Sequence, residues 1–184
     1  FTGSAVYRMH TKRHDFTDVA VSFELNIAGQ VTTAYTPAHD YDGVHIWLRH
    51  TSQFQLYAAS VARRDGTLMI KKKCPGGLSN GGTYYTLGRL PGRATKLRTW
   101  MKVGASARTD PGGSVTIVMS LGGRPVLSVT DAGSSPHPGW GSGTSQRIRS
   151  RASPWSGTVP TVVIEPDPCP VVVTAGNRPK CGWS

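Results

Sequence analysis

Hydrophobic and polar residues alternate along short stretches of this chain, which is the pattern of β-strands with one buried face. The clearest stretch is 44–49, where aliphatic residues take every second position and the intervening side chains are those of His45, Trp47 and Arg49. An imidazole, an indole and a guanidinium are suited to stacking and hydrogen bonding. We therefore predict that this strand displays a ligand-binding face.

Similar alternation predicts further strands at 19–27, 54–61, 67–73, 97–103, 115–119 and 126–129. The pattern contains no convincing helix and no internal repeat. Many short strands separated by Gly- and Pro-rich turns are typical of an all-β protein. We expect a two-sheet antiparallel β-sandwich.

The alternation ends near Ala132, and eight of the thirteen prolines fall in 132–184. We therefore expect a single β-sandwich domain at 1–131, followed by an irregular Pro-, Gly- and Ser-rich tail. The short apolar runs at 162–164 and 171–173 are candidates for one or two edge strands within the tail. Because the chain starts at Phe1 rather than at methionine, we expect a processed, secreted protein.

The net charge of the chain favours some classes of binding partner over others. The chain has 21 basic and 10 acidic side chains and a net charge of +11, which favours polyanions such as acidic polysaccharides, cell-wall polymers or nucleic acids. No nucleic-acid-binding motif and no apolar stretch of membrane-spanning length occurs. We expect a monomer that binds an anionic polysaccharide, with a role of the charge in solubility alone as the alternative.

The predicted register brings several polar side chains together. If residues 51–53 connect the strands at 44–49 and 54–61, Trp47 pairs with Tyr57 and Arg49 pairs with Gln55. His45 then shares their face. Stacking rings and planar hydrogen-bonding groups are what a sugar needs, although each ring could instead only cover the sheet under a loop.

Three further side chains are candidates for the same surface. Trp100 and Glu24 lie on the polar sides of their own strands. A two-residue turn at Asp65-Gly66 would place Lys72 beside Tyr57. With a bulge, its neighbours 71 and 73 would reach that face instead. A lysine run also protects a sheet edge from pairing with another chain, and this remains the alternative.

Ordinary glycoside hydrolysis is disfavoured, because the chain has only two glutamates, Glu24 and Glu165, and no strand with paired acidic residues. The Gly-x-Ser-x-Gly motif of serine hydrolases is absent as well. The alternative activity is a polysaccharide lyase, with Tyr57 or His45 as the base and Arg49 neutralising a uronic carboxylate. A structural or adhesion module is the third hypothesis.

Three cysteines are present: Cys74, Cys169 and Cys181. Cys169 and Cys181 are close enough in sequence to form a disulfide, which would leave Cys74 over, but the pairing stays open. No Cys-x-x-Cys spacing occurs, and His10 and His14, which are four residues apart, lie in a region that we interpret as strand and turn, so we expect no metal site. We expect no cofactor.

Four segments resemble the concanavalin A-like lectin/glucanase (LamG-like jelly roll) family of secreted bacterial proteins: DVAVSF at 18–23, DGVHIWLR at 42–49, TWMKV at 99–103 and LGGRPVLSVTD at 121–131. The resemblance covers roughly 1–131. It implies two stacked antiparallel sheets with sugar on or beside the concave face. The acidic catalytic strand and the acidic calcium loop of the family are missing. We therefore predict a carbohydrate-binding domain.

Overall fold

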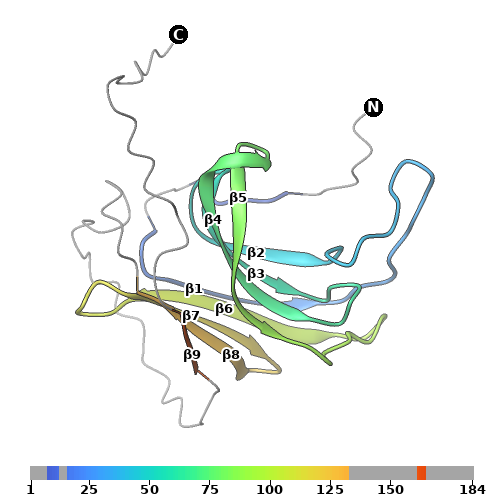
Figure 1. Cartoon of the computed structure of the whole chain (residues 1–184). Coiled ribbons are helices and arrows are strands. Elements are labelled where there is room, and N and C mark those ends of the chain that lie inside the picture. Colours follow the sequence, from blue (N-terminus) through green and yellow to red (C-terminus); the bar gives the residue numbers. More distant parts are fainter. Residues whose placement is uncertain (1–7, 13–15, 133–160, 165–184) are drawn as a thin grey trace.

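The computed structural model describes residues 8–12, 16–132 and the backbone of 161–164, and these residues form nine strands and no helix (Figure 1). The strands are β1 (Val19–Leu25), β2 (Val44–Ser52), β3 (Gln55–Val61), β4 (Leu68–Ser79), β5 (Gly82–Leu90), β6 (Met101–Thr109), β7 (Val115–Leu121), β8 (Arg124–Asp131) and β9 (Thr161–Ile164). The predicted all-β class is confirmed.

The strands form two sheets. One has the order β1-β6-β7-β8-β9 and the other has the order β2-β3-β4-β5. Neighbours among β1–β8 pair antiparallel, whereas β9 pairs with β8 in parallel. The apolar run at 162–164 thus lies within β9, and the run at 171–173 falls outside the described residues.

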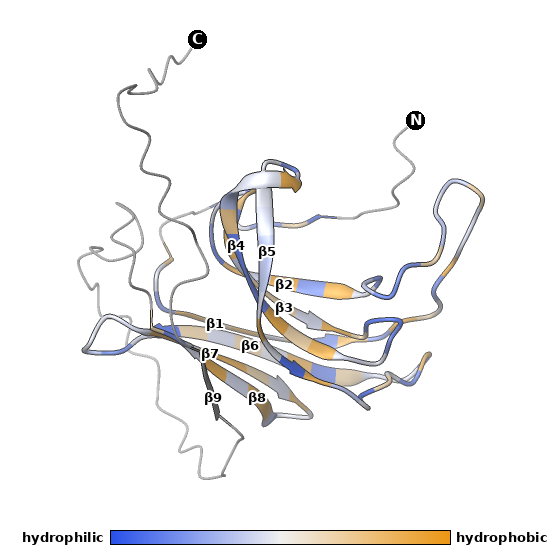
Figure 2. Ribbon diagram, viewed as in Figure 1, coloured by the Kyte–Doolittle hydropathy of each residue, from blue (hydrophilic) through white to orange (hydrophobic). Residues whose placement is uncertain are grey.

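The inner faces of the two sheets enclose the core (Figure 2). Ile46 and Leu48 of β2 are 7% and 2% exposed, and Ile117 and Met119 of β7 are fully buried in the other sheet. The predicted inward orientation of the aliphatic residues in 44–49 is therefore confirmed. Because a strand alternates its side chains, His45 and Trp47 point to the opposite, outer face of the four-stranded sheet.

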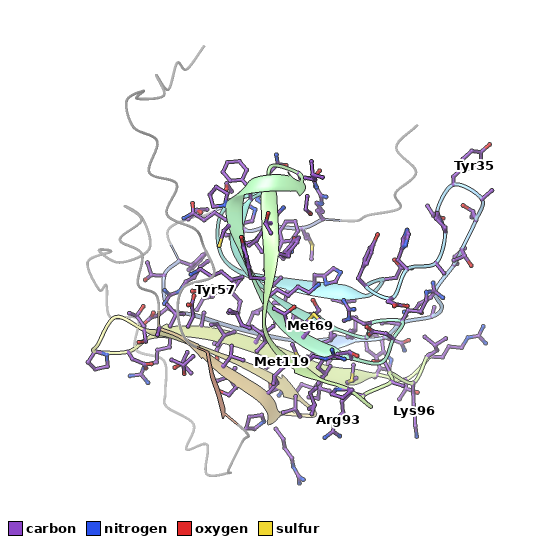
Figure 3. The ribbon with its side chains drawn as sticks, viewed as in Figure 1. Tyr35, Tyr57, Met69, Arg93, Lys96 and Met119 are labelled. Carbon is purple, nitrogen blue, oxygen red and sulfur yellow. The ribbon has the colours of Figure 1, made fainter. Side chains whose placement is uncertain are left out.

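The predicted pairing of β2 with β3 is wrong by one residue. Leu48, not Trp47, lies opposite Tyr57, and Trp47 lies opposite Ala58. A register shift between Leu48 and Ser52 causes the difference, and Arg49 within it has a φ of 49°. Extra residues in one strand change which side chains face inward beyond the irregularity. Tyr57 consequently enters the core (Figure 3).

The connection between β3 and β4 also differs from the prediction. It spans 62–67 rather than a two-residue turn, with a reverse turn closed by the hydrogen bond from the Gly66 amide to the Arg63 carbonyl at 3.0 Å. Gly66 has a φ of 67°, the left-handed region that favours glycine. The longer connection shifts the predicted register by two residues, which keeps Lys72 on the same side of the sheet as Tyr57. Because Tyr57 faces the core, Lys72 opposite it faces the core as well.

The two sheets approach each other closely at Gly88 of β5. A Cβ atom at this position would lie 2.5 Å from Cγ1 of Val129 in β8. We expect Gly88→Val to lower the free energy of unfolding by about 1–3 kcal/mol, because overpacking forces the sheets apart.

Urea denaturation measures this effect. Gly112→Ala is the matched control, because a Cβ there meets no atom within 4 Å, and its midpoint should stay near that of the parent protein. An unchanged midpoint for Gly88→Val would contradict the close approach of β5 and β8.

Cys74, in the middle of β4, is disulfide-bonded and 2% exposed. Of the pairings that the sequence leaves open, the one in which Cys74 is left over is therefore excluded. Only Cys169 and Cys181 remain as other cysteines, and both lie outside the described residues. Within the described part of the chain, no helix is long and apolar enough to cross a membrane.

Candidate binding face of the four-stranded sheet

The outer face of the four-stranded sheet carries aromatic and cationic side chains in rows across the strands. One row runs from Trp47 through Ala58 and Lys71 to Thr86. Directly paired residues point to the same side of a sheet. We call this surface the Trp47 face and define it by the following side chains: His45 and Trp47 on β2, Lys71 and Lys73 on β4, and Tyr84 on β5.

Small side chains form the floor of this face. Ala58 and Ser60 of the central strand β3 are 3% and 1% exposed, although they point away from the core between the sheets. Their neighbours on β2 and β4 are much larger: Trp47 and Lys71 flank Ala58, and His45 and Met69 flank Ser60. The flanking side chains therefore stand higher than the centre of the sheet.

Trp47 is half-buried and already contacts planar groups. The ring of His50 stacks parallel to it, with centroids 5.3 Å apart and an interplanar angle of 2°. The guanidinium carbon of Arg8 lies 5.7 Å from the centre of the indole ring. An indole that attracts a cation and a flat ring is a suitable platform for the C–H face of a sugar.

Tyr84 is the second aromatic ring of the Trp47 face and is 37% exposed. The ammonium nitrogens of Lys73 and Lys71 lie 4.9 and 5.6 Å from the centre of its ring. Lys73 also donates a hydrogen bond of 2.5 Å to the carbonyl of Gln53 and is only 2% exposed. Lys71 is half-buried, so of the two lysines it is the one open to a ligand.

Burial affects the charges on this face. It lowers the pKa of Lys71 below its usual 10.5, and the positive charge of Arg63 adds to the effect. The pKa of Lys73 is lowered as well, first by burial and then by Arg8. Burial likewise raises the pKa of the Tyr84 hydroxyl above 10.0. The ammonium groups have lost part of their hydration, so an anionic ligand would stabilise their charged form.

His45 adds a hydrogen-bonding group. Its Nδ1 lies 2.8 Å from the hydroxyl of Ser60, on the neighbouring strand. Burial of the ring lowers the pKa of His45 below 6.5, and the charges of Lys71 and Arg63 lower it further. The imidazole is therefore neutral at pH 7 and acts as a hydrogen-bonding group rather than a cation.

The lowered pKa has a consequence for stability. The unfolded chain binds a proton at His45 near pH 6.5, whereas the folded protein binds it only at lower pH. The contribution of His45 to stability is therefore complete above pH 6.5 and declines as the pH falls through the folded pKa. We expect an NMR titration to place the midpoint of His45 below 6.5. A midpoint above 6.5 would contradict the packing of this ring.

Two of the predicted site residues lie in the core instead. Tyr57 is fully buried and Lys72 is 4% exposed. The Tyr57 hydroxyl donates a hydrogen bond of 2.6 Å to Oδ2 of Asp131, and Nζ of Lys72 lies 2.9 Å from the same oxygen. Neither side chain belongs to the Trp47 face, so the predicted position of both is wrong.

Arg49 is also directed away from Trp47. Its guanidinium lies 2.8 Å from Oδ1 of Asp18, at the start of β1, and donates a hydrogen bond of 2.6 Å to the hydroxyl of Thr109 at the end of β6. The left-handed backbone at Arg49 coincides with this change of direction. Arg49 therefore links the two sheets at one edge and is no part of the Trp47 face.

Three further candidates are dispersed. Glu24 of β1 pairs with Lys102 of β6 and lies on the outer side of the other sheet. Trp100 immediately precedes β6 and is 70% exposed. Gln55 is half-buried beside the β2–β3 turn, where it pairs with Ser52. Of the predicted site residues, the structure places only His45 and Trp47 together on the Trp47 face.

No protein-family model matches this chain, and no curated protein or solved structure is significantly similar to it. The function is therefore argued from the chemistry of the Trp47 face alone. In the described ranges, no group of three or more His, Cys, Asp or Glu side chains is placed to hold a metal ion.

The residues missed by sequence reasoning are Tyr84 and Arg8. Tyr84 belongs to the Thr83-Tyr84-Tyr85 segment, whose alternation is too short to show which tyrosine faces outward. Arg8 precedes the first strand, and no pattern places it over Trp47. The bulge alternative did indicate Lys71 and Lys73. Both lie on the face because the one-residue shift between β2 and β3 turns Tyr57, and Lys72 opposite it, toward the core.

Proposed function

We propose that this protein binds an anionic polysaccharide on the Trp47 face. The observation that carries the proposal is the position of two aromatic rings, the half-buried Trp47 and the exposed Tyr84, on one surface with the half-buried Lys71. Aromatic rings stack on the C–H patches of sugar rings, and an ammonium pairs with a carboxylate or sulfate. The net charge of +11 draws a polyanion toward the surface.

We assign the pair of sheets to a concanavalin A-like jelly roll. Two sheets around one core, with antiparallel pairing throughout β1–β8, support this assignment. The disulfide at Cys74 supports a secreted protein, because disulfides persist in oxidising compartments. Both assignments go beyond the all-β architecture itself.

Binding is better supported than lyase chemistry. A lyase needs a base and a carboxylate-neutralising cation that both reach the substrate. Tyr57 is enclosed in the core and Arg49 is held by Asp18 and Thr109, so His45 is the only one of the three proposed catalytic residues that lies on the face. We expect no unsaturated product, detected by its ultraviolet absorbance, from a panel of uronic-acid polymers.

Affinity electrophoresis in gels that contain acidic or neutral polysaccharides tests the proposal. We expect retardation by uronic-acid or sulfated polymers at low salt and loss of retardation on Trp47→Ala. No retardation by any acidic polymer, or retardation that Trp47→Ala leaves unchanged, would refute the proposal. If Trp47→Ala leaves the retardation unchanged and the retardation decreases steeply with salt, the structural or adhesion module is favoured.

A lysine substitution tests the role of charge on this face. We expect Lys71→Gln to weaken binding of a uronic-acid polymer by roughly two- to tenfold at low salt and to flatten the salt dependence. Lys96→Gln is the matched control, because Lys96 is exposed in the loop between β5 and β6 (Figure 3). An equal effect of both substitutions would show that only the overall charge matters.

A further inference from the structure

The buried ion pair in the core differs in kind from the polar contacts at the surface. Nζ of Lys72 lies 2.9 Å from Oδ2 of Asp131, with their side chains 6% and 4% exposed. Tyr57, which is fully buried, donates its hydroxyl to the same oxygen at 2.6 Å. The ammonium of Lys72 and the hydroxyl of Tyr57 therefore both contact one oxygen of the Asp131 carboxylate, in a site closed to solvent.

We propose that Lys72 and Asp131 condense to an intramolecular isopeptide bond, with Tyr57 as the group that assists the reaction. Ions are costly to bury, and conversion of this pair to a neutral amide removes both charges from the core. The exclusion of solvent also protects the amide from hydrolysis. The bond would be a covalent modification made by the fold itself.

The atoms balance without a further reactant. A proton passes from the Lys72 ammonium to Oδ2 of Asp131, and the neutral amine attacks Cγ of that carboxyl group. The new bond is Nζ–Cγ and the bond that breaks is Cγ–Oδ2. Of the three ammonium hydrogens, one remains on the amide and two leave with Oδ2 as water. The Tyr57 hydroxyl, which donates a hydrogen bond to the departing oxygen, assists the protonation of that oxygen.

The position of the pair gives the bond a mechanical role. Lys72 is in β4 of the four-stranded sheet, and Asp131 ends β8 of the five-stranded sheet. A bond between them joins the two sheets covalently through the core. Such a cross-link holds the two sheets together under mechanical force and in the presence of proteases. This property suits a protein exposed outside the cell.

Intact mass spectrometry of the full chain, after reduction of its disulfide, tests the proposal. We expect a mass lower than that of the sequence by one water molecule, and a branched peptide that joins Lys72 to Asp131 after proteolysis. A folded protein with the full sequence mass would overturn the proposal and leave an ion pair. A linear peptide with the same deficit at Asp65-Gly66 would overturn it too, because succinimide formation there loses the same water.

Four variants sharpen the test. Lys72→Arg keeps a cation beside the carboxylate and should restore the full mass in a folded protein, as should Asp131→Ala. Lys71→Arg, on the outer face, should retain the deficit. Tyr57→Phe should slow the reaction and give a mixture of both masses in freshly folded protein. A deficit that persists in Lys72→Arg contradicts the proposal.

Discussion

Trp47→Ala is expected to weaken binding of the acidic polysaccharide by roughly 10- to 100-fold. The estimate follows from a stacked indole that contributes about 1.5–3 kcal/mol through buried area and ring contact. The indole is half-buried on the outer face, whereas its neighbours in sequence, Ile46 and Leu48, pack in the core. The substitution should therefore remove the platform without unfolding the sheet.

Isothermal titration calorimetry or affinity electrophoresis measures this loss, with circular dichroism to verify the fold. Trp100→Ala is the matched control, because Trp100 is 70% exposed and precedes β6 in the other sheet. Its affinity should remain that of the parent protein. A comparable loss for both tryptophans would move the binding surface away from the Trp47 face.

Asp131→Ala is expected to produce the largest loss of stability, about 3–5 kcal/mol. The substitution removes the anion beside a buried ammonium and the acceptor of the Tyr57 hydroxyl. Because β3, β4 and β8 all contribute to this cluster, its loss weakens the contact between the sheets. In the amide form the substitution removes a covalent link between the two sheets instead, and we expect a loss of similar size.

The milder substitution Tyr57→Phe removes only the hydroxyl and should cost about 1.5–3 kcal/mol where Lys72 and Asp131 form the ion pair, the range for a hydrogen bond to a charged group. Urea denaturation measures both effects. Asp40→Ala is the control, because Asp40 is exposed and its substitution should change stability by less than about 0.5 kcal/mol. An Asp131→Ala variant as stable as Asp40→Ala would show that the cluster contributes nothing.

Period-two alternation was sufficient to predict the strands and the all-β class. It also predicted that Ile46 and Leu48 face the core while His45 and Trp47 face outward, because alternation within one strand depends on that strand alone. The lysine run was ambiguous for the same reason. The residues before it, at 68–70, are all apolar, so alternation does not single out one face of this strand.

The tertiary structure determined which side chains from different strands lie on the same face. The irregularity at Arg49 shifts β2 against β3 by one residue from the predicted register, and such a shift transfers every side chain to the opposite face. The six-residue connection before β4 shifts the next register by two residues, which preserves the face. Tyr57 and Lys72 consequently lie with Asp131 in the core rather than beside Trp47. Bulges and loop lengths depend on contacts between distant segments, such as Arg49 with Asp18 and Thr109, which local alternation does not encode.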